Sequence, residues 1–364
     1  MKIFINGRFL SQRTTGVQRY ATELVLALDR ALSSDRVLRS KFTFTILLPK
    51  GVKNPLNLQF IKVKSVGYLS GYLWEQLELP LYSFGTLLLN FCNMAPLFKK
   101  RSIVTISDVS VFSSPGGYSR VFLLWYRIAL PIIGRMADSI ITISDFSKME
   151  IVKFLHIPEN KIRRIYLGVS KSSLGAPSDS FIASITAKFK GEPFLLTVGS
   201  LNPNKNIKLL LNSMGSLTDL NLKVAVVGGG NEKVFGAENF SCQDTVEFLG
   251  YVSECELKWL YENAALFVFP SIYEGFGLPP LEAMIHGCPV AVSNAASLPE
   301  ICGNAAIYFD PYDIPDIATK IRALFLNVEL QAVYRELGFQ RISNFTWDNC
   351  ALETINLINK RHAL

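Results

Sequence analysis

One stretch in the second half of the chain, residues 266–289, constrains the fold most. It begins with the apolar run Leu266–Phe269, whose shortness and aromatic content predict a buried strand. A glycine-rich turn follows at residues 274–277, and two prolines at 279–280 suit the first turn of a helix. Gly287 would end that helix. Strand, glycine turn and helix in this order predict one unit of a parallel α/β sheet.

The same stretch carries groups suited to a ligand with phosphate and hydroxyls. Free backbone N–H groups at the start of a helix attract phosphate. Glu274 opens the turn and Glu282 lies within the helix, so both carboxylates can face the crevice at the helix start. An isolated Glu282 would more often be a solvated residue on a helix surface, but the surrounding twenty-residue pattern favours a functional role.

That pattern, F-P-S-I-Y-E-G-F-G-L-P-P-L-E-A-M with G-C-P-V and S-L-P-E after it, resembles a known signature. It is similar to the E-x7-E motif of retaining, nucleotide-sugar-dependent glycosyltransferases of the GT-B type, often called family 4. The resemblance implies an α/β fold with two Rossmann-like, doubly wound parallel-sheet domains that face each other across a cleft.

Length and local patterns independently favour two domains. A chain of 364 residues exceeds the size at which single cores stop growing, and strands alternate with helices through both halves. We expect an N-terminal, acceptor-binding domain over 1–172 and a C-terminal, nucleotide-sugar-binding domain over 173–345. By resemblance, a final helix in 346–364 would cross back onto the first domain. Residues 170–190, rich in Ser, Ala and Gly, are interpreted as the linker.

The two halves differ in charge. Residues 1–175 carry 24 basic and 10 acidic side chains, a net of +14, whereas residues 176–364 carry 13 and 20, a net of −7. A basic half suits nucleic acid, an anionic membrane or a polyanionic substrate. No nucleic-acid motif accompanies it. We therefore favour a membrane surface that carries a lipid-linked acceptor, with an ordinary basic surface as the open alternative.

Other segments indicate where in the cell the protein is expected to be. The most apolar stretch, residues 121–136, is interrupted by Arg127 and Arg135, so no transmembrane helix is expected. The start of the chain is interpreted as a first strand and not as a signal peptide. Six cysteines show no metal-binding spacing and suggest buried free thiols in a reducing cytosol. The expected location is the cytoplasm, with peripheral contact at the inner face of the cell membrane.

Two segments of the first half contain further site candidates. The segment T-T-G-V-Q-R-Y resembles the family's N-terminal glycine loop, which implies donor contact at Gly16 and a sugar-side or acceptor-side role for Arg19. Many relatives carry His-Asp where this chain has Ser107 and Asp108. Both residues are acceptor-side candidates, and the missing histidine leaves the choice of donor sugar open. For Asp108 the alternative is a turn cap.

In the second half, G-S-L-N-P-N-K-N resembles the family's phosphate loop, with Lys205 at the lysine position. Many relatives also carry an arginine where this chain has Ser200 or Asn204. Gly229, Gly230 and the segment 250–252 suit a base and ribose pocket, because backbone can approach a ligand closely there. The donor-binding candidates of this half are Ser200, Asn204, Lys205, Val252, Glu274, Gly275, Phe276, Gly277, Leu278 and Glu282.

The resemblance also implies roles for the catalytic candidates Glu274 and Lys205. Glu274 would hold a hydroxyl of the transferred sugar near the developing positive charge, and Glu282 would accept hydrogen bonds from the ribose. Lys205 and nearby amides would stabilise the leaving phosphate. Departing phosphate would take the proton of the attacking hydroxyl, which gives retention. No D-x-D doublet follows a strand, so we expect neither a metal nor a cofactor.

The predicted function is transfer of a hexose from a nucleoside-diphosphate sugar to a glycan or lipid-linked glycan in surface polysaccharide synthesis. GDP-mannose is the favoured donor, and UDP- or dTDP-sugars are alternatives. Two other functions stay open: a sugar-nucleotide epimerase on the same fold, and a catalytically silent sugar-nucleotide-binding subunit.

Overall fold

The computed structural model describes residues 1–171, 175–200, 202–229 and 245–362, and the chain divides into two compact units. Unit 1 comprises Met1–Gly168 together with Phe345–Leu364, and unit 2 comprises Val169–Asn344. The boundaries predicted from the sequence fall slightly later along the chain.

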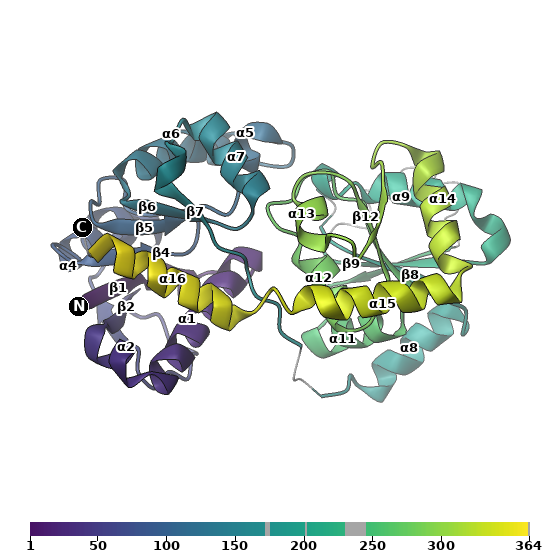
Figure 1. Ribbon diagram of the computed structural model, residues 1–364, viewed down its shortest axis with the longest axis horizontal. Helices are drawn as coiled ribbons and strands as arrows, with labels where there is room; N and C mark the ends of the chain where they lie inside the picture. The colour runs from purple at the N-terminus through teal and green to yellow at the C-terminus, as the bar shows by residue number, and fades with distance from the viewer. Residues whose placement is uncertain (172–174, 201, 230–244, 363–364) are drawn as a thin grey trace. The chain divides into compact units, whose positions relative to one another are not determined.

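Unit 1 is built on a seven-stranded parallel sheet with the order β3-β2-β1-β4-β5-β6-β7 (Figure 1). The chain reverses its direction of winding between β1 and β4, which makes this the switch point where α/β sheets commonly bind ligands. Lys62 and Lys64 are exposed on the edge strand β3, a common protection against edge-to-edge pairing. The strands are β1 (Lys2–Asn6), β2 (Thr43–Pro49), β3 (Lys62–Val66), β4 (Leu87–Asn90), β5 (Ser102–Thr105), β6 (Ser139–Thr142) and β7 (Ile162–Arg164).

Helices cover the sheet of unit 1, and the last helix of the chain, α16, packs along α1 (Figure 1). Trp347, at the start of α16, lies 6.2 Å from the ring of Tyr20 on α1. The helices are η1 (Gly7–Ser11), α1 (Gly16–Ser34), α2 (Arg36–Lys41), α3 (Gly71–Leu73), η2 (Trp74–Glu78), α4 (Leu79–Tyr82), α5 (Ser110–Ser113), α6 (Arg120–Met136), α7 (Asp145–Leu155), η3 (Glu159–Lys161) and α16 (Trp347–His362).

Unit 2 has a six-stranded parallel sheet with the order β10-β9-β8-β11-β12-β13. Its strands are β8 (Phe194–Val198), β9 (Lys223–Val227), β10 (Val246–Gly250), β11 (Leu266–Phe269), β12 (Val290–Ser293) and β13 (Ile307–Phe309). Its helices are α8 (Asp179–Phe189), η4 (Pro203–Lys205), α9 (Ile207–Ser213), η5 (Met214–Ser216), η6 (Thr218–Leu220), α11 (Glu254–Asn263), α12 (Leu278–Ile285), α13 (Leu298–Cys302), α14 (Ile314–Phe325) and α15 (Val328–Ile342).

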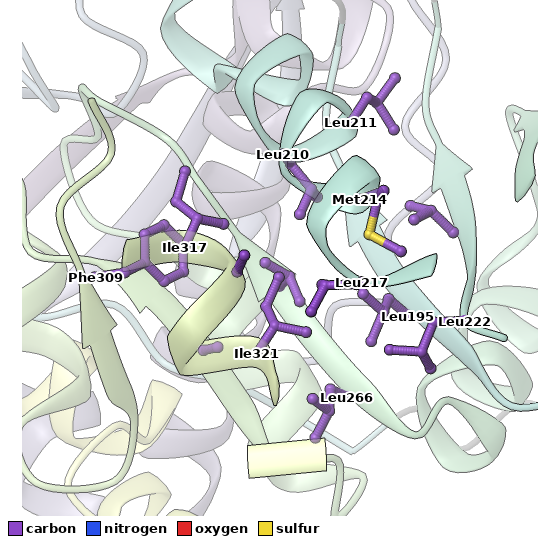
Figure 2. Packing of buried hydrophobic residues seen from close by; sticks show 14 of the residues in the cluster. Leu195, Leu210, Leu211, Met214, Leu217, Leu222, Leu266, Phe309, Ile317 and Ile321 are labelled. Atoms are coloured by element: carbon purple, nitrogen blue, oxygen red, sulfur yellow. The ribbon is translucent and has the colours of Figure 1, made fainter. Parts of the chain in front are cut away.

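The core of unit 2 joins these helices to the sheet. Figure 2 shows Leu210 of α9 and Ile317 and Ile321 of α14 packed with Leu195 and Leu266 of the central strands. All five side chains are essentially inaccessible to solvent. Burial of such side chains stabilises a fold by about 1.5–3 kcal/mol each, so this cluster fixes the strands whose ends carry the site.

The structure confirms the predicted pair of Rossmann-like, parallel-sheet domains. The predicted linker over 170–190 is wrong in its second part, which forms helix α8. The Ser178 hydroxyl accepts a hydrogen bond from the Phe181 N–H at the start of this helix, and Ile185 and Phe189 are buried. Cys288, Cys302 and Cys350 are buried free thiols, as predicted, whereas Cys92 and Cys255 are free thiols that are only partly buried. Burial raises the pKa of Cys288 and of Cys302 to about 12. Cys242 lies outside the described residues.

Within the described ranges, none of the helices has the length and apolar content needed to span a bilayer.

We expect Gly168→Ala to destabilise unit 1. A Cβ at Gly168 would lie 2.3 Å from the backbone N of Trp347 and 2.5 Å from its Cγ, so the start of α16 would have to shift. Overpacking of this kind costs about 1–3 kcal/mol. Thermal unfolding followed by circular dichroism measures the effect. Gly116→Ala is the control, because a Cβ there has no neighbour within 4 Å. Equal melting temperatures for both variants would contradict the close packing.

Candidate functional site

Two loops of unit 2 are joined at the carboxyl ends of β8 and β11. These strands are neighbours in the sheet, and parallel pairing brings the segments that follow them to the same edge. The backbone carbonyl of Asn204 accepts a hydrogen bond from the Ile272 N–H at 2.8 Å. The Ser271 hydroxyl lies 2.8 Å from the same carbonyl oxygen. The loop that precedes α9 is therefore fixed against the loop that precedes α12.

These joined loops carry an ion pair between Lys205 and Glu274. The Lys205 Nζ lies 2.5 Å from the Glu274 Oε1, and the two side chains are 25% and 13% exposed. The Ser271 hydroxyl is 2.6 Å from the same carboxylate oxygen. The ammonium also lies 5.4 Å from the centre of the Phe269 ring. A Cβ at Gly199 would be 3.3 Å from the Lys205 Cγ, so the lysine stem runs close over the backbone.

The turn before α12 requires glycine at its last position. Gly277 is the N-cap residue with φ of 105°, and a Cβ there would be 2.7 Å from the Leu298 Cδ2. The Ser297 hydroxyl lies 2.9 Å from the Glu274 carbonyl oxygen and 2.8 Å from that of Phe276. Prolines at 279–280 have no N–H, so the backbone donors near this helix start belong to residues 275–278.

Glu282 lies one turn into α12 and is partly buried. The hydroxyl of Tyr261, on α11, donates a hydrogen bond to the Glu282 Oε2 at 3.3 Å. The ring of Tyr261 in turn packs edge-on against Phe267 of β11, with centroids 5.5 Å apart. Tyr261, an aromatic residue of the core, thus orients the carboxylate of Glu282, the second acid of the predicted E-x7-E pair.

The glycines that follow β9 lie beside Gly250 and Tyr251, at the end of β10. The Gly228 N–H donates to the Gly250 carbonyl at 2.8 Å, and a Cβ at Gly229 would be 2.1 Å from the Tyr251 hydroxyl. Val252 follows Tyr251 in the chain and is half-buried. Gly230, also predicted for the base pocket, lies outside the described residues. Ser200 is exposed in the loop after β8.

Four predicted site residues belong to unit 1. Gly16 is exposed at the first position of α1, and Arg19 is partly buried one turn later. The Ser107 N–H donates to the Asn93 Oδ1 at 2.8 Å. The Asp108 Oδ1 accepts from the Ser110 N–H at 2.9 Å, the turn-capping contact that was its alternative role.

A buried polar network at the switch point of unit 1 was not predicted from the sequence. Asn6, at the end of β1, donates to the Glu75 Oε1 at 2.8 Å and to the Asn90 Oδ1, at the end of β4, at 3.0 Å. Arg8 donates to the Glu75 Oε2 at 2.8 Å and lies over the Tyr72 ring. Burial raises the pKa of Glu75, although Arg8 and Asn6 oppose the shift. Asparagines that end the apolar runs K-I-F-I-N and L-L-L-N were the available signal.

The orienting roles of Ser271, Ser297 and Tyr261 were not predicted either. Each of them contacts a residue of the E-x7-E stretch. Ser271 and Ser297 stand in the quoted segments F-P-S and S-L-P-E, whereas Tyr261 lies outside the pattern. His286 is enclosed by α11 and α12 beside Tyr261, and burial lowers its pKa although Glu262 opposes the shift. In the part of the chain that the structure describes, no group of three or more His, Cys, Asp or Glu residues is arranged to hold a metal ion.

Comparison with known proteins places this chain in a family. Residues 179–341 match the family model of glycosyl transferases group 1. The chain is 31% identical over 265 residues to O-antigen chain mannosyltransferase B of Escherichia coli, which covers 71% of this chain and 70% of that protein. It is 28% identical over 326 residues to O-antigen chain mannosyltransferase RfbU of Salmonella typhimurium, which covers 85% and 87%.

Solved structures support the fold. The sucrose-phosphate synthase structure from Thermosynechococcus elongatus superposes with a TM-score of 0.72 at 18% identity, over 100% of this chain and 99% of that chain. This likeness concerns architecture, and the family rests on the sequence match to the E. coli relative. Two parallel-sheet domains, the matched segment and that relative together show that the protein is a GT-B-fold member of the glycosyl transferases group 1 family.

Proposed function

We propose that the protein is a retaining, metal-independent mannosyltransferase of family 4 that uses GDP-mannose. The acceptor would be a hydroxyl of a glycan or lipid-linked glycan in O-antigen-type polysaccharide synthesis, at the inner face of the cell membrane. The observation that carries the proposal is the Lys205–Glu274 ion pair beside the 275–278 turn. The choice of mannose is supported by the relatives named as O-antigen mannosyltransferases. UDP- and dTDP-sugars are the alternative donors.

Donor binding would redistribute the contacts of this ion pair. In the structure the Lys205 ammonium is neutralised by Glu274. A diphosphate carries more negative charge than one carboxylate, so it would attract Lys205 and the N–H groups of residues 275–278. Glu274 would then be released to accept a hydrogen bond from the sugar. Ser271 contacts the same carboxylate oxygen and would keep Glu274 oriented during this exchange.

The remaining donor contacts follow from the same geometry. Glu282 would accept hydrogen bonds from the vicinal ribose hydroxyls, while Tyr261 holds its other oxygen. The segment from Gly250 to Val252, with Gly229, would contact the base. Ser200 and Asn204 supply polar groups but no positive charge, which leaves Lys205 and the turn amides to stabilise the diphosphate.

Transfer would proceed by cleavage of the bond between the anomeric carbon and the phosphate oxygen. Positive charge develops at that carbon close to Glu274, and negative charge develops on the phosphate close to Lys205. The acceptor hydroxyl would attack from the face that the phosphate leaves, and its proton would pass to the departing phosphate. Configuration is thereby retained without a metal or a protein base. Gly16 and Arg19, with Ser107 and Asp108, are the residues proposed to complete donor and acceptor binding from unit 1.

Binding of nucleotide sugars tests the choice of donor. We expect GDP-mannose to raise the melting temperature of the protein by several degrees in the presence of EDTA, because a ligand that binds only the native state stabilises it. Differential scanning fluorimetry with GDP-, UDP- and dTDP-sugars measures the shift. A shift with UDP- or dTDP-sugars alone would contradict the GDP-mannose assignment. A shift that EDTA removes and Mn²⁺ restores would contradict metal independence.

Glu282→Ala should weaken binding of GDP-mannose by about tenfold or more, since hydrogen bonds to a charged group contribute about 1.5–3 kcal/mol. Isothermal titration calorimetry gives the affinity. Glu329→Ala is the matched control, because Glu329 is exposed on α15. Unchanged affinity in the Glu282 variant, with an intact circular dichroism spectrum, would remove Glu282 from the donor site.

Lys205→Ala should lower turnover of GDP-mannose at least tenfold. Removal of a single group that stabilises the charge developing in the transition state has an effect of at least this size in other enzymes. Slow hydrolysis of the donor, followed by proton NMR, gives the rate and the anomer first released. Lys320→Ala is the control, because Lys320 and its 4.0 Å partner Asp316 are only partly buried, with side chains 41% and 31% exposed. Near-normal turnover would refute the role of Lys205. First release of the inverted anomer would refute retention, and release of an isomerised sugar would indicate an epimerase.

A further inference from the structure

Unit 1 exposes large apolar side chains along two neighbouring helical segments. On α3, η2 and α4, Leu73, Leu77 and Leu81 recur every four residues and are 62%, 57% and 74% exposed. On α6, three further apolar residues, Val121, Leu124 and Ile128, are each at least half exposed. Spacings of three and four residues place side chains on one side of a helix. Each segment thus turns an apolar stripe toward solvent.

Side-chain contacts show that these stripes are parts of one surface. Tyr72 of α3 and Trp125 of α6 pack edge-on with ring centroids 5.9 Å apart. The Lys99 Nζ donates to the carbonyls of Ser83 and Thr86 at 2.9 Å. That contact joins the loop that carries Phe98 to the loop that carries Phe84.

Phe84 and Phe98 are 87% and 78% exposed and extend this surface beyond the end of α4. We define the apolar face as Leu73, Leu77, Leu81, Phe84, Phe98, Val121, Leu124 and Ile128. Single exposed apolar residues are ordinary, whereas eight large ones on adjoining elements are typical of an interaction surface.

The charges around this face are mostly positive. Residues 79–138 contain six basic side chains and two acidic ones: Asp108, whose carboxylate accepts from the Ser110 N–H, and Asp138, which is exposed. Glu75 of the first segment is 2% exposed, and Glu78 accepts hydrogen bonds from the Tyr68 and Leu69 N–H groups. The basic residues are Lys99, Lys100, Arg101, Arg120, Arg127 and Arg135, all of them exposed except Lys99.

We propose that the apolar face docks unit 1 onto an anionic lipid bilayer. Leucine and phenylalanine side chains would enter the boundary between headgroups and acyl chains, and exposed Tyr68, Tyr72 and Tyr82 suit the interfacial region. Arginine and lysine around them would contact lipid phosphates. A second copy of this chain fits less well, because a two-fold contact would set two cationic surfaces against each other.

The biological role of this docking surface rests on the proposed function. A transferase bound to the bilayer through unit 1 would reach a lipid-linked acceptor in the same bilayer. The binding itself needs neither donor nor acceptor. Failure of vesicle binding is therefore distinguishable from failure of the transferase assignment, which the nucleotide-sugar measurements test separately.

Vesicle flotation with the full chain tests the proposal. We expect binding to phosphatidylcholine vesicles that contain phosphatidylglycerol, and weaker binding to phosphatidylcholine alone. The double variant Leu77→Glu, Leu124→Glu should bind at least tenfold more weakly, because two apolar contacts are lost and two negative charges are added. The matched control is Val37→Glu on α2, where Val37 is 71% exposed outside the apolar face. It should bind as the unmodified chain does.

Three results would overturn the proposal: no flotation with anionic vesicles, equal binding by the double variant and the control, or binding indifferent to phosphatidylglycerol. Light scattering supplies a second readout. A dimer of the unmodified chain that dissociates in the double variant would assign the face to a second copy instead of a bilayer. Both variants change exposed side chains, so a circular dichroism spectrum and a melting temperature equal to those of the unmodified chain would show that each is folded.

Discussion

The partly buried ion pair between Lys205 and Glu274 is the interaction on which the site of unit 2 depends. It exists because β8 and β11 are parallel neighbours, so that the loops after them meet and are joined at the Asn204 carbonyl. Withdrawing two charges from water costs free energy that their attraction only partly repays, and such pairs are weak evidence for stability. A cation and a carboxylate held beside a glycine turn are better explained by a ligand that uses both.

Much of this fold could be predicted from the sequence, and the failures have identifiable causes. Short apolar runs predicted the strands around the candidate site, and the prolines at 279–280 indicated the start of α12. Helix α8 was mistaken for linker because Ser and Ala are common in both, although Ile185 and Phe189 stand four residues apart on its buried side. The E-x7-E motif was recognisable because its characteristic residues are concentrated in one short stretch.

Residues that orient the site could not be predicted, because their partners are distant in the sequence. Tyr261 contacts Glu282 from another helix, and Ser297 contacts the carbonyls of the glycine turn. In unit 1, Arg8 and Glu75 are separated by 67 residues yet form one buried network with Asn6. Local patterns predict elements, whereas such contacts arise only when the sheet order brings strand ends together.

The central claim is that unit 2 grips a diphosphate between the Lys205 ammonium and the amides of the turn before α12. A crystal structure of the protein with GDP tests this most directly. We expect a phosphate oxygen within hydrogen-bonding distance of the Lys205 Nζ, which would have left Glu274, and the ribose hydroxyls at Glu282. A diphosphate bound elsewhere, with the Lys205–Glu274 pair intact, would contradict the account.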